Sequence, residues 1–281
     1  MNYQNKIKLV LIFPVALTAG NLGLEFENNS GESSYIVESV AQDLKAKLIF
    51  PFKYYSANFS YEHEFSFFNI KLITSFLLKN KKTIGEDYDW LNNNLTVFST
   101  STNKIDNYSG YTIEISKKIK NHFTIITSFT YKLLSLYWQN TTEQDFIKNK
   151  TTTIEGTTLK YQQKIYQYNL GLLYKNIFTE KLSIELNPFL EYALIDSKDT
   201  HILRDFYTKQ ISNTYGYKLI LNTTYKINNR VKVVLSGKYT YLKDTNTKMD
   251  YFNALDEKYL TLPSSFIYKN RSIGIGFFIQ F

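Results

Sequence analysis

The chain of 281 residues contains no cysteine. This absence excludes a disulfide scaffold and catalysis by a thiol nucleophile. Long hydrophobic runs are also absent. Beyond the first 20 residues, no apolar stretch approaches the ~20 residues that a membrane-spanning helix requires. No nucleic-acid-binding motif is present either. The sequence therefore offers no candidate for a thiol enzyme, a helical membrane protein or a nucleic-acid-binding protein.

Aromatic residues, by contrast, are abundant, with 24 Tyr and 21 Phe. Such numbers are typical of classes that use amphipathic aromatics, including membrane barrels with aromatic girdles at both interfaces. The length allows one large domain or two small ones. We find no domain boundary and no internal repeat, which favours a single domain.

Residues 1–19 have the pattern of a secretory signal peptide. Lys6 and Lys8 precede the apolar run 9–17, and small residues follow at 18–20. The alternative is a buried first strand. We predict cleavage near Ala19, which leaves 20–281 as the mature domain and lowers the formal charge from +8 to +6. A modest positive charge on an exported protein favours contact with anionic lipid or a polyanion over nucleic acid.

The last eleven residues alternate in polarity. One face carries five large apolar side chains, and the other carries mainly small or polar ones, which is typical of a lipid-facing strand. The apolar positions are Ile273, Ile275, Phe277, Ile279 and Phe281. A terminal aromatic residue on such a strand resembles the sorting signal of bacterial outer-membrane barrels. The alternative, an edge strand of a soluble sheet, would need a covering layer.

Alternation with period two recurs along the whole chain, as expected for strands with two different faces. Short polar turns alternate with longer polar segments near 79–106, 140–156, 196–211 and 244–265, a pattern typical of outer-membrane barrels. We therefore predict an all-β fold, a single closed antiparallel transmembrane β-barrel of about ten strands, with both termini on the periplasmic side. A soluble sandwich would also alternate. The predicted strands are 20–37, 42–64, 67–80, 106–119, 123–139, 156–174, 181–196, 211–228, 230–245 and 266–281.

Two short motifs carry the candidate chemistry. Asp87 and Asp89 are two residues apart, so in an extended chain their carboxylates share a face, and Asp199 and His201 repeat this spacing. The predicted barrel places the two motifs in the second and fourth outer loops, or at the tips of their strands, where they can face each other across the mouth. Three carboxylates around one histidine could activate a water molecule. They could also hold a divalent cation.

With these two motifs, the chain resembles the omptin family, the ten-stranded outer-membrane endoproteases of Gram-negative bacteria. The resemblance is carried by Glu86-Asp87-Tyr88-Asp89-Trp90 and Asp199-Thr200-His201, with support from 160–164 and 31–35. It implies that Asp199 orients His201, which deprotonates a water held against the Asp87/Asp89 pair. The water then attacks the scissile carbonyl of a peptide. No metal is required by this mechanism.

The resemblance also implies a substrate pocket and a lipid site. The family binds a basic substrate residue with two acids, and the matching positions here are Glu32 and Ser197, with Asp196 beside the latter. Because Ser197 is not acidic, we expect a relaxed preference that still leans toward basic cleavage sites. Of the family's lipopolysaccharide contacts, Tyr131 and Lys164 are the remaining candidates. No cofactor is expected, although activity could require lipopolysaccharide.

These expectations place the protein in the outer membrane of a Gram-negative bacterium, as a monomer whose active site faces outward and acts on peptides or proteins at the cell surface. A different class remains open: a barrel with lost or retuned catalysis that acts as an adhesin or host-protein binder. A passive pore is disfavoured because side chains normally fill a barrel of this size. Among the remaining Trp and His residues, we expect Trp138 in the aromatic girdle and His63 and His122 near inner turns. Trp90 could shield the site or cap a strand.

Overall fold

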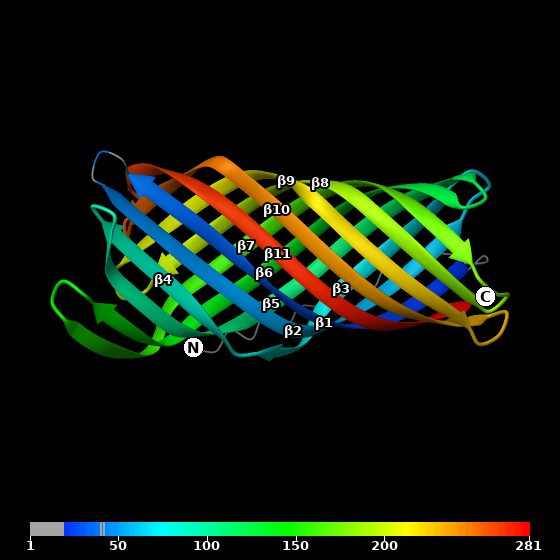
Figure 1. Cartoon of the computed structure of the whole chain (residues 1–281), viewed down its shortest axis with the longest axis horizontal. Helices are drawn as coiled ribbons and strands as arrows, with labels where there is room; N and C mark the ends of the chain where they lie inside the picture. Colours follow the sequence, from blue (N-terminus) through cyan, green and yellow to red (C-terminus); the bar gives the residue numbers. More distant parts are fainter. Residues whose placement is uncertain (1–19, 40, 42) are drawn as a thin grey trace.

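The computed structural model describes residues 20–39, 41 and 43–281, so the predicted signal peptide lies outside the described residues. Eleven antiparallel strands form one sheet that closes on itself (Figure 1). The predicted closed antiparallel barrel is therefore confirmed. In the described part of the chain, no helix is long and apolar enough to cross a membrane. The strands are β1 Gly20–Ser39, β2 Leu44–Glu64, β3 Asn69–Lys81, β4 Thr83–Leu91, β5 Asn94–Lys120, β6 Phe123–Asp145, β7 Lys150–Ile177, β8 Leu182–His201, β9 Phe206–Lys226, β10 Val231–Asn253 and β11 Lys258–Gln280.

Two of these strands share one position in the barrel. β2 pairs with β3 from Lys53 to Glu64 and with β4 from Leu44 to Ile49. On the other side, β5 likewise pairs with both. Only Lys82 separates β3 from β4 along the chain. The wall therefore has ten strand positions, in agreement with the predicted number.

The barrel closes between its first and last strands. β1 pairs with β11 from Asn21↔Gln280 to Val37↔Ser264, while its other edge pairs with β2. Below these rows, the Gly20 amide donates to the Phe281 carbonyl at 3.2 Å, and the Phe281 amide donates back at 3.1 Å. Closure satisfies the backbone polar groups of both edges, which lipid could not do.

The two faces of the wall have the chemistry that the sequence predicts. Outward positions of β11, such as Ile273 and Phe277, are large and exposed. The interior of the same half holds buried polar groups. Lys238 bonds Glu25 at 2.9 Å and also bonds Glu27, and both carboxylates come from β1. These side chains occupy the interior of the barrel at this level, as expected where side chains fill a barrel of this size.

The strands are longer at one end than predicted. β5 begins at Asn94 rather than 106, and β7 begins at Lys150 rather than 156. Much of the four predicted long loops is therefore strand. These segments are rich in Thr, Ser and Lys, so their alternation lacks the hydrophobic signal on which the prediction relied. They end in tight hairpins, with left-handed residues such as Asn92 (φ 50°) and Asn93 (φ 60°) at one turn.

An aromatic cluster crosses the interior near this extended end. Phe50 stacks on Tyr161 with ring centroids 4.0 Å apart and an interplanar angle of 7°. Trp138 lies 4.9 Å from Phe50 and is 3% exposed. The prediction that Trp138 belongs to the lipid-facing girdle is therefore wrong, because its place in β6 turns the indole inward. The cluster forms a hydrophobic floor beneath the rim.

Candidate active site

Each of the two predicted motifs lies on a strand rather than in a loop, and the two strands belong to separate parts of the wall. Asp87 and Asp89 lie in β4, and Asp199 and His201 lie in the last three residues of β8. Electrostatic interactions connect Asp87 with Asp199, and Asp89 with His201. The structure thus brings the four predicted residues together at one end of the barrel.

The imidazole of His201 contacts the more deeply buried acid of its own strand. Its Nε2 lies 3.5 Å from Asp199 Oδ2, longer than a well-formed hydrogen bond. The ring stacks on Phe206, with centroids 4.3 Å apart and an interplanar angle of 17°. Asp199 is 1% exposed, and its Oδ2 also accepts a hydrogen bond of 2.5 Å from the Tyr35 hydroxyl. Its Oδ1 is buried without a partner.

The two acids of β4 share their surroundings. Burial raises the pKa of Asp87 well above its ordinary value, and the charges of Asp89, Asp199 and Glu143 raise it further against an opposing contribution from Arg204. Burial also raises the pKa of Asp89, while Arg204 and His201 lower it. A close acid pair with raised pKa values titrates as a unit and retains a proton at higher pH than isolated carboxyls.

The acid pair is held by a rigid backbone. β4 is hydrogen-bonded on both edges, with Asp87 opposite Leu48 of β2 and Ser99 of β5. Gly85 lies two positions before Asp87 on the same face, and the Trp138 indole occupies the space where a Cβ would stand. Trp90 is on the opposite face, stacked on Tyr88 at 5.6 Å. It therefore does not shield the acids.

A neutral polar layer lies two positions below Asp199. The Gln163 amide donates to Ser33 Oγ at 2.9 Å, to the Tyr161 hydroxyl at 2.8 Å and to Ser197 Oγ at 3.4 Å. All four side chains are buried. Ser197 thus faces the interior as predicted, and the layer beneath the catalytic candidates contains no acid.

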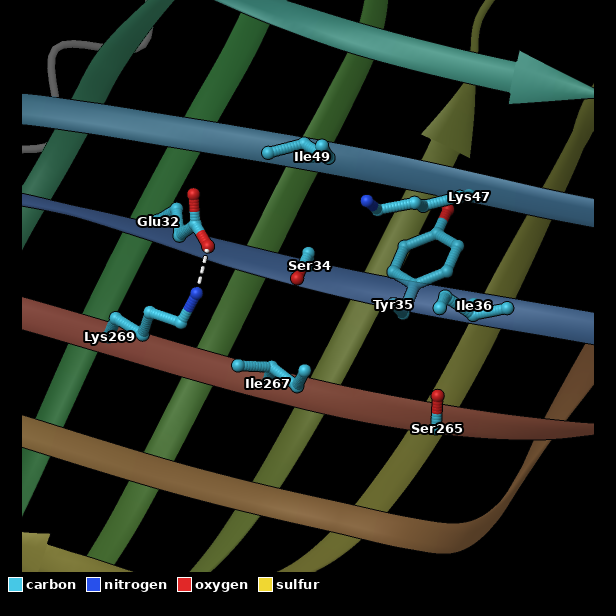
Figure 2. Close-up of a pocket in the computed structure, with 9 residues that line it drawn as sticks. All are labelled: Glu32, Ser34, Tyr35, Ile36, Lys47, Ile49, Ser265, Ile267 and Lys269. Carbon is cyan, nitrogen blue, oxygen red and sulfur yellow. Dashed lines mark hydrogen bonds and ion pairs between the residues drawn. The ribbon is translucent and has the colours of Figure 1, made fainter.

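The two acids predicted to accompany Ser197 face the other way. Ser33 and Tyr35 of β1 are buried inside the barrel, so the alternation of the strand turns Glu32 outward. Its carboxylate bonds Lys269 Nζ at 2.8 Å on the outer wall (Figure 2). Asp196, between the buried Ile195 and Ser197, is likewise turned outward. The expectation that Glu32 and Asp196 line the substrate pocket is therefore wrong.

The predicted lipid contacts are also on the outer wall. Tyr131 follows the buried Thr130 in β6, so its side chain turns to the outer face. There it packs on Tyr166, with the two ring centroids 5.2 Å apart. Lys164 is opposite Leu133 of β6 and Asp196 of β8 in the register. Both side chains are thus on the face where lipid would lie.

Several residues of the site were not predicted from the sequence. Tyr35 contacts Asp199, and the charges of Glu143 and Arg204 act on the acid pair, with Arg204 Nη2 3.7 Å from Glu143 Oε2. Tyr251 belongs to the same surroundings, since its pKa is raised by burial and by the charge of Asp199. The only sequence signal for Tyr35 was its place in the stretch 31–35. His63 and His122 lie in or beside the turns at the far end, as expected.

Four buried polar atoms in and beneath the site have no hydrogen-bond partner in the described part of the chain. Asp87 Oδ1, Asp199 Oδ1, Trp138 Nε1 and Gln163 Oε1 are all buried without a hydrogen-bond partner. Buried polar groups normally have hydrogen-bond partners, so several unpaired atoms close together are suited to a site that binds a polar ligand. Within the described residues, no group of three or more His, Asp or Glu side chains has an arrangement suited to a metal ion.

Comparison with known proteins finds similarity in structure alone. No protein-family profile and no curated protein sequence matches the chain. The fold is similar to that of the outer membrane protease OmpT from Escherichia coli, with a TM-score of 0.78, 11% sequence identity and coverage of 94% of this chain and 97% of that one. The predicted resemblance to the omptins is therefore confirmed at the level of the fold. The translocator domain of the autotransporter NalP from Neisseria meningitidis (TM-score 0.43, 10% identity, coverage 94% and 89%) and the outer membrane protein OprG from Pseudomonas aeruginosa (TM-score 0.41, 12% identity, coverage 94% and 96%) are more distant barrels.

Proposed function

We propose that this protein is an outer-membrane endopeptidase that activates water between the Asp199–His201 dyad and the Asp87/Asp89 pair. The observation that carries the proposal is the convergence of these four residues from β4 and β8 at one end of the barrel. The fold of the chain is similar to that of an outer membrane protease. The site lies near the ends of long strands, and we propose that this end projects from the membrane, which would suit action on peptides outside the cell.

The proposed reaction is a general acid–base hydrolysis. Neutral His201 accepts a proton from the water as the water oxygen attacks the peptide carbonyl carbon. The carbonyl oxygen gains the negative charge, while the Asp87/Asp89 pair holds the attacking water from the side opposite His201. The imidazolium then gives its proton to the leaving nitrogen as the C–N bond breaks. The products are a carboxylic acid and an amine, and His201 is neutral again.

The preference for basic cleavage sites rests on the rim rather than on a pocket. Asp89 and Glu143 place two carboxyl groups near the site, and such groups would attract cationic peptides. Arg204 offsets part of their negative charge, and the buried layer below the site is neutral. We therefore propose a specificity that leans toward basic residues without the strictness of a paired-acid pocket.

The proposal includes the membrane setting. The protein acts as a monomer in the outer membrane of a Gram-negative bacterium, with the site outward, and contacts lipid and lipopolysaccharide through the outer wall. Tyr131 and Lys164 are the proposed lipopolysaccharide contacts. Their support is their outward orientation from β6 and β7.

The test is a cut-site map. The protein, refolded in detergent micelles with lipopolysaccharide, is incubated with a mixed peptide library, and the products are sequenced by mass spectrometry. His201→Ala and Asp199→Asn should each reduce kcat/KM by about 10²–10⁴-fold. His122→Ala at the opposite end is the matched control and should change nothing. Full activity in the His201 variant would refute the mechanism, and loss of activity in excess chelator would point to a metal.

A binder of surface ligands is the alternative function. The neutral layer around Gln163 and the 3.5 Å separation within the dyad favour it, because neither is optimised for basic substrates or for proton transfer. Absence of any cleavage in the library, together with retention of a host protein on the folded barrel, would establish this alternative.

A further inference from the structure

The proposed function leaves a difficulty about the charge of His201. A general base must be neutral before it takes a proton. Yet Asp199 lies beside the imidazole, Asp89 interacts with it from β4, and Asp87 and Glu143 are nearby. Clustered carboxylates favour the protonated imidazolium, which cannot act as a base. A donor that stabilises the charge on Asp199 would weaken the pull of that carboxylate on the imidazole proton.

Tyr35 is placed to do this from the opposite side of Asp199. Its hydroxyl donates to Asp199 Oδ2 at 2.5 Å, and this is the oxygen that lies 3.5 Å from His201 Nε2. No other hydrogen bond reaches the Asp199 carboxylate from the described residues, since Oδ1 is unpaired. The acceptor thus has one strong donor, and that donor is a neutral phenol rather than the imidazole.

The phenol is fixed in position. Tyr35 is 3% exposed, with its ring 5.9 Å from that of Phe50 and 6.3 Å from that of Tyr161. Burial and the charge of Asp199 raise the phenol pKa well above its ordinary value. The hydroxyl therefore keeps its proton throughout the range in which a peptidase would act, and it remains a donor.

We propose that Tyr35 is a positioning residue of the dyad, whose hydroxyl orients Asp199 and takes up part of its negative charge so that His201 remains a neutral base. The inference rests on the proposed function. Hydrogen bonding to a carboxylate stabilises its charged form and weakens its pull on a neighbouring proton. The Tyr35 hydroxyl bonds Asp199 directly, so its contribution passes through that carboxylate.

The other groups around the imidazole define what the test must separate. On the elements that surround His201 are Asp199 of its own strand, Asp87 and Asp89 of β4, Glu143 of β6, Tyr251 of β10 and Arg204 in the following turn. The Arg204 guanidinium offsets part of the acidic charge. Tyr35 is distinguished among them by a direct bond to the dyad acid.

The decisive variant is Tyr35→Phe, which keeps the ring and removes the hydroxyl. The measurement is an NMR titration of the imidazole in micelles, practicable because the chain has only three histidines and His201→Ala assigns the signal. We expect the midpoint of the His201 titration to move to higher pH. The matched control is Tyr54→Phe, a buried tyrosine of the same core that does not contact Asp199, and it should leave the midpoint unchanged.

The activity profile provides the second readout. In Tyr35→Phe the acid limb of the pH profile of kcat/KM should move to higher pH. At neutral pH, kcat/KM should fall by ~10-fold, and it should recover at alkaline pH. A structural role alone would lower activity at every pH. In the Asp199→Asn background the Tyr35→Phe change should have no further effect on the titration.

An unchanged titration midpoint in Tyr35→Phe would overturn the inference. If the wild-type protein cleaves nothing, the proposed function fails, but the titration still decides the role of Tyr35. If Tyr35→Phe does not fold, 3-fluorotyrosine introduced at position 35 serves instead. Its more acidic phenol is a stronger donor, so the midpoint should move to lower pH, and no movement would equally overturn the inference.

Discussion

Gly85 provides a test of how closely the acid pair depends on packing. An ideal Cβ built at this position would lie 2.4 Å from Trp138 Cε2 and 2.5 Å from its Nε1. Carbon atoms at their optimal separation are about 3.5–4.0 Å apart, so Gly85→Ala creates an overlap of more than 1 Å with a rigid indole. The indole cannot withdraw easily, because it packs against Phe50.

The expected cost has two parts. Overpacking of a filled core typically destabilises a protein by about 1–3 kcal/mol. The strain is relieved if β4 moves outward, which displaces Asp87 two residues on. A misplacement of ~1 Å in a catalytic group can cost about 10²-fold in rate. Gly85→Ala should therefore fold, with reduced stability, and lose about 10²-fold in kcat/KM.

The assay compares peptide cleavage with the folded fraction judged by electrophoretic mobility before and after heating. Gly237→Ala is the matched control, because a Cβ there meets nothing within 4 Å. Trp138→Leu should restore part of the activity of Gly85→Ala by making room for the methyl group. Wild-type kcat/KM in Gly85→Ala would refute the reasoning, as would a loss that Trp138→Leu does not relieve.

Three further predictions concern charge. Asp87→Asn should flatten the pH dependence of the free energy of unfolding in urea. Because the pKa of Asp87 is raised in the folded state, its contribution to stability is complete below the pKa of the unfolded state and is lost as pH rises through the pKa of the folded state. The stability of the variant relative to wild type should therefore increase toward high pH. Ser197→Asp should not sharpen the preference for Arg and Lys, because Ser197 lies in the buried neutral layer below the site; the buried carboxylate should instead lower stability in urea by about 1–3 kcal/mol, whereas Asp196→Asn on the outer wall should change neither the cut-site map nor the stability. Lys164→Ala should reduce any stimulation by lipopolysaccharide in a micelle assay, and equal stimulation would remove Lys164 from the lipid site.

The sequence predicted what depends on local alternation. Asp87, Asp89, Asp199 and His201 could be assigned to shared faces because the spacing of two holds on any strand. The same rule separated Ser197 from Asp196. It could not orient Glu32, because no residue of β1 was known to face inward and a shift of one position reverses every side chain.

Other features depend on register and could not be read locally. Tyr35 and Asp199 are 164 residues apart, and only the closed sheet brings them into contact. Trp138 was assigned to the girdle on residue type, whereas its orientation follows from the pairing of β6. The sequence predicts shorter strands than the structure has, because the polar ends of the strands carry no hydrophobic pattern.

The seam between β1 and β11 has a consequence for the order of assembly. Every other pairing in the wall joins strands close in sequence, whereas this one joins the two ends of the barrel and carries the largest loop-closure entropy. The hairpins should therefore form before the seam. Until β1 is in place, Tyr35 cannot reach Asp199, so a chain with its seam open already contains both motifs of the candidate site but lacks the phenol. In a refolding time course at neutral pH, peptidase activity should accordingly rise by a last factor of ~10 when the seam closes, after the hairpins have formed.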